Sequence, residues 1–309
     1  MAWEMNQLRQ HRFTKIGITA LLLLSLQASA ARLAIVIDDF GYRPHNENKI
    51  LQMPVAVSIA ILPDSPHGRE MAEKAYKQGR EILIHLPMAP LSKQLLEPDT
   101  LQPTMSSEEI DRIIQRAIQK VPYAVGINNH MGSAMTSRLP GMQKVMRSLS
   151  RYNLYFLDSV TIGNSQATKA AQGTPVRVIR RNVFLDDVQS EAETRHQLNR
   201  AISIARKNGS AIAIGHPHST TIRALQQMLP TLPADIELVS PSRLLSGKPV
   251  GDNQRKWGKL CEIKEAPVTV TSQDYLAVIG DTLVDNPIVN TVSRYIQKLT
   301  GDKSQDKTE

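Results

Sequence analysis

The clearest indication of the fold is the segment Leu33-Ala34-Ile35-Val36-Ile37-Asp38-Asp39-Phe40-Gly41. Five consecutive apolar residues without polar alternation are typical of a strand that is buried on both faces of a parallel sheet. The strand runs directly into two aspartates, at the point where a dinucleotide-binding fold has a glycine-rich phosphate turn. The stretch therefore predicts the first strand of an α/β fold and argues against dinucleotide binding.

Seven more apolar runs, each four to seven residues long, follow along the chain. They are residues 55–61, 82–85, 124–127, 154–157, 176–179, 211–214 and 236–239. Helical patterns lie between them: Ser106 and Glu109 form a capping box, and the patterns at 65–78 and 191–207 end before Gly79 and Gly209. Eight strands alternating with helices predict a parallel sheet, either an open doubly wound sheet or a barrel.

The N-terminus has the three parts of a signal peptide. A basic stretch from Arg9 to Lys15 precedes the 11 apolar residues 16–26, and an Ala-x-Ala cleavage site ends at Ala30. The apolar core is shorter than the ~20 residues that a membrane-spanning helix needs. We therefore expect residues 1–30 to be removed and the protein to be periplasmic or secreted. No cysteine follows the apolar core, which argues against a lipoprotein anchor.

The mature chain is expected to have one catalytic domain and a C-terminal extension. The catalytic domain covers residues 31–246. Residues 247–264 are rich in Gly, Lys, Asp and Asn and are predicted to be a linker. The rest of the extension, 247–309 as a whole, is predicted to hold a short amphipathic helix at 287–299 and a disordered tail.

Composition argues against two further classes of protein. The chain carries a formal charge of +8, and residues 1–30 hold three Lys or Arg and one acid, which leaves +6 on the mature protein. These charges are scattered, and aromatic residues make up 4% of the chain, so the stacking platforms of single-strand nucleic-acid binders are missing. The single cysteine, Cys261, cannot form an intramolecular disulfide.

Aspartate or histidine follows five of the predicted strands. The residues are Asp38, Asp39, His85, His130, Asp158, His216 and His218. The carboxyl ends of parallel strands form the active face of barrels and of open sheets alike. Adjacent carboxylates repel each other and need a cation or a shared proton. One Asp or His alone is more often a helix cap or a structural residue, but together these residues predict a site for Zn²⁺ or a similar divalent cation.

The same segments resemble, in order and spacing, the motifs of the divergent polysaccharide deacetylases of bacterial envelopes. They read Ile-Asp-Asp-Phe-Gly at 37–41, His-Leu-Pro-Met at 85–88, Asn-His-Met-Gly-Ser at 129–133, Phe-Leu-Asp-Ser at 156–159 and Ile-Gly-His-Pro-His at 214–218. The resemblance extends from about residue 33 to 245. It implies a distorted (β/α) barrel of about seven strands that removes acetyl groups from a glycan with the help of a metal.

The resemblance also implies roles for individual residues. Asp38 corresponds to the general base, Asp39 to a metal ligand, His130 to the first histidine of a His-x-x-x-His pair, and His216 to the general acid. The second histidine of that pair is replaced by Ala134. We therefore expect a third ligand from another strand, either His85 or His218.

Of these two histidines we slightly favour His218 as the ligand. It lies two residues beyond His216, and alternate residues of an extended segment face the same side. Contacts to the substrate are expected from residues of the same motifs and from one nearby arginine: Asn129, Ser133, Asp158 and Arg43.

Three functions remain open from the sequence. The first is a zinc-dependent deacetylase acting on an acetylated envelope glycan, with no nucleic acid as partner and no stable membrane insertion once the signal peptide is cut. The second is a catalytically silent glycan-binding or scaffold protein of the envelope. The third is a metal-dependent hydrolase of amides or phosphate esters. A phosphate substrate favours an arginine cluster, and only Arg43 and Arg138 lie close to the motifs, with Arg180 and Arg181 as a further contribution.

Overall fold

The computed structural model describes residues 30–245 of the 309-residue chain. These residues belong to one compact unit, Met1–Lys259, and the second unit, Leu260–Glu309, lies outside the described residues. The predicted signal peptide, linker and C-terminal helix lie outside them as well. Within the described part, no helix is long and apolar enough to cross a membrane.

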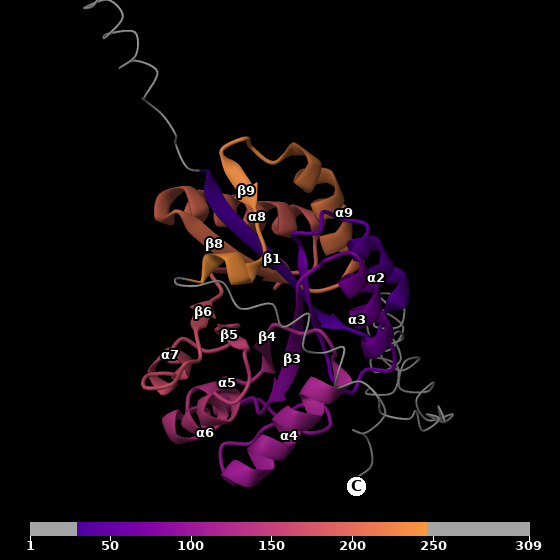
Figure 1. Cartoon of the computed structure of the whole chain (residues 1–309). Coiled ribbons are helices and arrows are strands. Elements are labelled where there is room, and N and C mark those ends of the chain that lie inside the picture. Colours follow the sequence, from indigo (N-terminus) through magenta and orange to yellow (C-terminus); the bar gives the residue numbers. More distant parts are fainter. Residues whose placement is uncertain (1–29, 246–309) are drawn as a thin grey trace, which may run out of the picture. The chain divides into compact units, whose positions relative to one another are not determined.

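Nine parallel strands form a single sheet in the part of the chain that the structure describes (Figure 1). The strands are β1 (Ala31–Phe40), β2 (Ser58–Ile61), β3 (Ile82–Met88), β4 (Gly126–Met131), β5 (Tyr155–Asp158), β6 (Val178–Arg180), β7 (Val183–Phe184), β8 (Ser210–Gly215) and β9 (Ile236–Leu238). Their order is β6-β5-β4-β3-β2-β1-β8-β7, and β9 pairs with the first residues of β1. All eight predicted strands are present, and β7, only two residues long, is the one that the sequence analysis missed.

The two edges of the sheet are joined by the chain itself. Strands β6 and β7 lie at opposite ends of the strand order, yet only two residues separate them. The N–H of Arg181 donates to the carbonyl of Asp158 (3.0 Å), and the N–H of Asn182 donates to that of Ile212 (2.8 Å). The backbone thus crosses from β5 to β8, and the sheet curls into a distorted barrel. The barrel prediction is confirmed, with nine strands in place of about seven.

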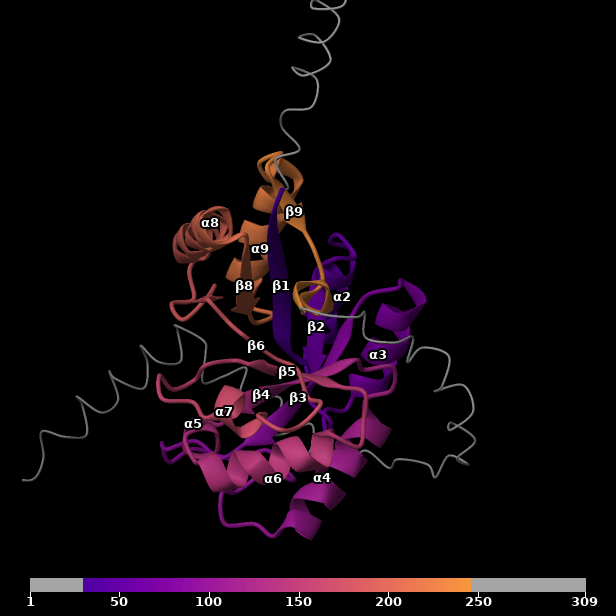
Figure 2. The ribbon, with the colours of Figure 1, turned by 60° about the vertical axis from the view of Figure 1, so that its left-hand side comes forward.

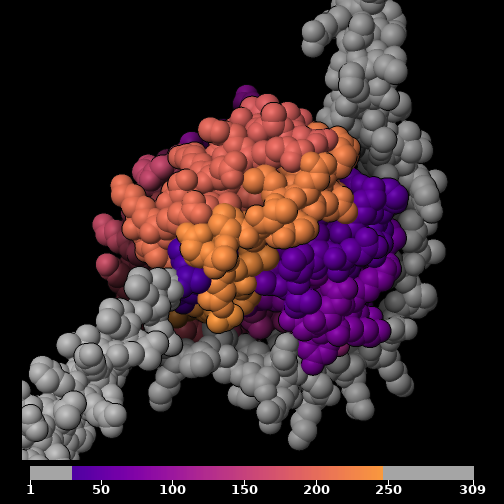
Figure 3. Space-filling model, turned by 90° about the horizontal axis from the view of Figure 1, so that it is seen from above, coloured from indigo at the N-terminus to yellow at the C-terminus, as the bar shows by residue number. Residues whose placement is uncertain are grey.

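Helices cover the outside of the curled sheet (Figures 1 and 2). They are α2 (Pro44–Leu51), α3 (Gly68–Lys77), α4 (Ser107–Lys120), α5 (Ser133–Thr136), α6 (Leu139–Leu149), α7 (Ala167–Ala170), α8 (Glu191–Asn208) and α9 (Ser219–Met228), with 3₁₀ turns at Leu229–Thr231 and Pro241–Leu244. The predicted capping box of Ser106 and Glu109 opens α4, and Gly209 ends α8 with a φ of +80°. Figure 3 shows the surfaces of the first and last described segments side by side, as the pairing of β9 with β1 requires.

Alternate strand residues face two different apolar cores. The inner core fills the barrel and contains Ala34, Val36, Ala60, Leu83, Tyr155, Leu157, Ile212 and Ile214. Their neighbours along each strand, such as Ile35, Ile84 and Ala213, pack outward against the helices. Burial on both faces explains why these strands lack polar alternation. It also gives each strand residue a side of the sheet, inner or outer, and this division decides which polar residues reach the site.

Candidate metal centre and acid–base site

The polar residues of the site continue the inner face of the strands toward their carboxyl ends. Asp38 lies two residues after Val36, and His85 lies two residues after Leu83, so each follows an inner-core residue at the strand period. Strand pairing places Asn128 beside His85 and His130 beside Pro87. Along β1 and β3, the inner face therefore changes from apolar to polar over two residues at this end of the barrel.

Asp39 reaches the site through a backbone irregularity. Regular alternation would send its side chain outward, away from Asp38. The register between β1 and β2 shifts between Ile37 and Phe40, and Asp39 adopts a φ of +56°. A bulge of this kind re-aims a side chain, and Asp tolerates left-handed backbone better than most residues. The two consecutive aspartates can therefore both serve the same site.

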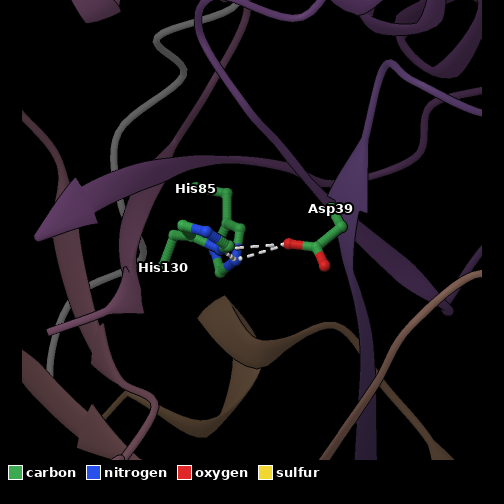
Figure 4. Close-up of side chains that lie close together, drawn as sticks. All are labelled: Asp39, His85 and His130. Atoms are coloured by element: carbon green, nitrogen blue, oxygen red, sulfur yellow. Dashed lines mark hydrogen bonds and ion pairs between the residues drawn. The ribbon is translucent and has the colours of Figure 1, made fainter. Parts of the chain in front are cut away.

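Asp39, His85 and His130 bring three ligand atoms together (Figure 4). Asp39 Oδ1 lies 3.1 Å from His85 Nε2 and 3.1 Å from His130 Nδ1. The two histidine nitrogens are also 3.1 Å apart. Atoms about 2.0–2.1 Å from a single zinc ion lie roughly 2.9–3.4 Å from one another at octahedral to tetrahedral bond angles. The three residues have the spacing of a cation site.

The hydrogen bonding of Asp39 fits the same interpretation. Its Oδ1 atom is buried and has no hydrogen-bond partner, although the side chain as a whole is 36% exposed. A buried carboxylate oxygen without a partner is costly unless a cation neutralises it. Burial favours the neutral acid, but His130 and His85 outweigh it and hold the pKa of Asp39 well below its usual value. Asp39 is therefore a carboxylate, the form that binds a cation.

Asn128 fixes the protonation of His85. Its Nδ2 donates to Asp38 Oδ1 (2.8 Å), so its Oδ1 is the atom that faces His85 Nδ1, also at 2.8 Å. Because that oxygen only accepts, Nδ1 must carry a proton, and in the neutral imidazole Nε2 is then the nitrogen that presents a lone pair toward Asp39 and His130. Metal-binding histidines are commonly oriented in this way by a partner on their second nitrogen.

A second group of Asp and His lies at the ends of β7 and β8. Asp186 Oδ1 lies 2.9 Å from His216 Nδ1, and Oδ2 accepts from the backbone N–H of His216 (2.6 Å) and from Thr221 Oγ1 (2.7 Å). Burial opposes the charged imidazole, but Asp186, Asp39 and Asp38 outweigh it and raise the pKa of His216 to about 9. At neutral pH this histidine is therefore protonated.

Comparison with known proteins identifies the family. Residues 35–245 match the divergent polysaccharide deacetylase family. The chain belongs to this family. It is 58% identical to the uncharacterized protein YibQ of Escherichia coli, covering 89% of this chain and 90% of YibQ, and 43% identical to an uncharacterized protein of Haemophilus influenzae, covering 74% and 82%.

One solved structure has a fold similar to that of this protein. It is that of an uncharacterized protein from Agrobacterium tumefaciens, with a TM-score of 0.66 and 24% identity, and the match covers 71% of this chain and 91% of that one. At this identity the likeness supports the barrel alone.

The structure places His85, and not His218, beside Asp39 and His130. His218 belongs to the second group, with Asp186 and His216. This geometry favours His85 as the third ligand, whereas the sequence slightly favoured His218. His218 does share a side with His216, at a ring separation of 5.8 Å, and its ligand atom groups with those of Asp186 and His216.

Three of the four residues expected to bind substrate are occupied by internal hydrogen bonds. Asn129 accepts from the N–H of Ser159 and donates to the carbonyl of Met131. Ser133 Oγ accepts from the N–H of Leu91, and Asp158 Oδ1 accepts from that of Val160. Asn129 and Asp158 are each 1% exposed, so they brace loops. Arg43, the fourth, is exposed near His218 and remains a candidate.

Two residues of the site were missed by the sequence analysis. Asn128 stands beside Asn129 in the sequence, and only the inner or outer position on β4 separates them. Asp186 follows the short run Val183-Phe184-Leu185, the same pattern of apolar residues and aspartate that singled out Asp158. Recognising that run as a strand would have revealed Asp186.

Proposed function

We propose that this protein is a divalent-cation-dependent hydrolase of the cell envelope that removes acetyl groups from a polysaccharide or other glycan. The observation that carries the proposal is the triangle of Asp39, His85 and His130, with its buried and unpartnered carboxylate oxygen. Two imidazoles and one carboxylate are a ligand set of catalytic zinc sites, so zinc is the cation we propose. A cation held there would polarise the acetyl carbonyl and stabilise the negative charge that develops on its oxygen.

Asp38 is the proposed general base. Burial raises its pKa above the usual value, against the opposing charges of His85 and His216, and so moves it toward the range useful for proton transfer at neutral pH. Its Oδ1 is held by Asn128, and its Oδ2 lies 3.6 Å from His85 Nδ1. In the proposed reaction Asp38 takes a proton from the attacking water, whose oxygen forms the new bond to the acetyl carbon.

His216 is the proposed general acid. As the acetyl C–N or C–O bond breaks, the leaving amine or alkoxide takes a proton from the imidazolium. Asp186 holds the ring through Nδ1, which leaves Nε2 as the donating atom. With a pKa of about 9 this histidine is protonated before the reaction begins.

The two alternative functions are less well supported. The catalytically silent glycan-binding protein would follow if Ala134 left the site without a third ligand, and His85 supplies a candidate for that ligand. A phosphate substrate favours clustered guanidinium groups. Arg180 instead lies 3.3 Å from Asp158, and Arg181 donates to the carbonyls of Ser159 and Val160.

Elemental analysis combined with an acetate assay tests the proposal. Protein recovered from the envelope without added metal is expected to hold about one divalent ion per chain and to release acetate from N- or O-acetylated oligosaccharides. His130→Ala is expected to lose both properties. Wild-type protein that binds the ion and releases no acetate would favour the catalytically silent glycan-binding protein. Wild-type protein that binds no ion would contradict the proposal outright.

A further inference from the structure

Large apolar side chains are exposed mainly at the end of the barrel that carries the site. Among residues 30–245 five are exposed: Val55 (47%), Leu91 (65%), Leu95 (95%), Leu96 (45%) and Val188 (61%). Three of them lie in the connection between β3 and α4, which leaves the strand that carries His85. Val188 follows β7 on the same end of the barrel, whereas Val55 precedes β2 on the opposite end. Clustered exposed apolar groups mark interaction surfaces.

The β3–α4 connection is fixed at its base. The N–H groups of Ala134 and Met135 donate to the carbonyl of Ala89, and Leu91 N–H donates to Ser133 Oγ (2.9 Å). On the other side, Tyr42 Oη donates to Glu97 (2.9 Å). The leucines are therefore presented outward from an anchored loop, between the segments that follow β1 and β4.

The charges around these leucines are predominantly basic. Arg43, Lys93 and Arg138 form no side-chain hydrogen bond or ion pair within the described part of the chain. Two neighbouring acids are paired with cations, Asp64 with Lys120 and Asp99 with Arg116. Glu97 accepts a hydrogen bond from the neutral Tyr42 hydroxyl, so it keeps its charge and offsets one positive charge. Asp187, beside Val188, is exposed and offsets a second positive charge, which leaves the three cations Arg43, Lys93 and Arg138 in excess of the two unpaired acids. The result is an apolar loop flanked by unpaired cations.

We propose that Leu91, Leu95 and Leu96 dock the protein onto an anionic lipid bilayer, with Arg43, Lys93 and Arg138 against the headgroups. Aliphatic side chains with adjacent cations are the features that bind proteins to a membrane surface without spanning it. A protein partner fits less well, because such interfaces use about 20–30 residues a side, with aromatic anchors at their centre. Docking would turn the end of the barrel with the Asp39 group toward glycans attached to the membrane.

Vesicle sedimentation with matched variants tests the docking surface. Protein recovered from the envelope is mixed with vesicles of phosphatidylethanolamine and phosphatidylglycerol, or of phosphatidylcholine alone. Wild-type protein is expected to bind the anionic vesicles, and binding should weaken as salt increases. The double variant Leu91→Ser, Leu95→Ser should bind at least about tenfold more weakly, and Lys93→Gln about fivefold more weakly. Val55→Ser, an exposed apolar residue at the other end, should bind as the wild type does.

Each contrary result overturns the proposal. Absence of vesicle binding by the wild type would do so, as would equal binding by the double variant. If sedimentation velocity shows dimers of the wild type that the double variant does not form, a second copy of the chain covers these leucines in place of a bilayer. Unchanged thermal unfolding of the double variant is required, since a lower Tm would mean that another part of this chain covers the leucines. None of these readouts depends on acetate release.

Discussion

The two groups of Asp and His at the end of the barrel contain the same residue types and differ in how their carboxylates are used. Asp186 gives both oxygens to hydrogen bonds, from the side chain and N–H of His216 and from Thr221. Asp39 Oδ1 has two histidine nitrogens at 3.1 Å and no hydrogen bond. The hydrogen-bonded carboxylate of Asp186 orients a histidine, whereas the carboxylate of Asp39, which faces two imidazole nitrogens without a hydrogen bond, has the arrangement of a cation site. Residue type alone does not separate these roles.

Asp38 lies close enough to both groups that the charges of His85 and His216 both act on its carboxylate. Asp38→Asn removes the proposed base and leaves the cation triangle in place. We expect acetate release to fall by about 10²–10⁴-fold, while cation affinity changes by less than about tenfold. Single-turnover kinetics and zinc titration calorimetry measure the two effects. Equal losses of cation and activity would place Asp38 among the ligands instead.

His85 and His218 offer a matched pair of substitutions across the two groups. His85→Ala removes a corner of the triangle, so cation affinity should fall by about 100-fold or more, beyond the effect of disturbing an outer partner. His218→Ala should leave it within about threefold. Competition with a zinc-binding dye gives both affinities. A larger loss in His218→Ala would reverse the assignment of the third ligand.

The neighbouring asparagines Asn128 and Asn129 of β4 separate the effect of an inner position from that of an outer one. Asn128→Ala frees His85 to change its protonated nitrogen, and cation affinity should fall by roughly 10- to 100-fold. Asn129→Ala breaks the brace to Ser159 and Met131, so it should lower the Tm by several degrees and spare cation affinity. Calorimetry and thermal unfolding separate the two outcomes. Loss of cation by both variants through unfolding would show that the inner and outer positions do not divide the roles.

The smallest effect is expected from the second group. His216 acts only while protonated, so activity should be retained below its pKa and lost as pH rises through about 9. Asp186→Asn removes a carboxylate that raises this pKa, and the alkaline loss should move to lower pH by about one unit or more. A pH–rate profile shows the shift. A limb that stays near 9 in the variant would exclude His216 as the acid.

Much of the fold was readable from the sequence because its strands are buried on both faces. Apolar runs such as Leu33 to Ile37 have few other interpretations. Strand β7, Val183-Phe184, closes the barrel, but two residues are too few to predict a strand by themselves. The positions of Asp38, His130 and His216 at strand ends followed from the same runs.

The division of the site residues into two groups was not readable. It depends on which residues face inward, and the bulge at Asp39 breaks the alternation where it matters most. The sequence could not decide between His85 and His218 as third ligand for a related reason. The two-residue spacing of His216 and His218 fixes their shared side, but which aspartate lies there depends on the pairing of β7 with β8.

Anomalous diffraction at the zinc absorption edge, from crystals of the protein grown with zinc, locates the cation relative to the two groups of Asp and His. One strong peak is expected about 2.0–2.1 Å from Asp39 Oδ1, His85 Nε2 and His130 Nδ1, with no peak between Asp186 and His218. A peak in the second group alone, or crystals without a peak at the triangle, would contradict this expectation.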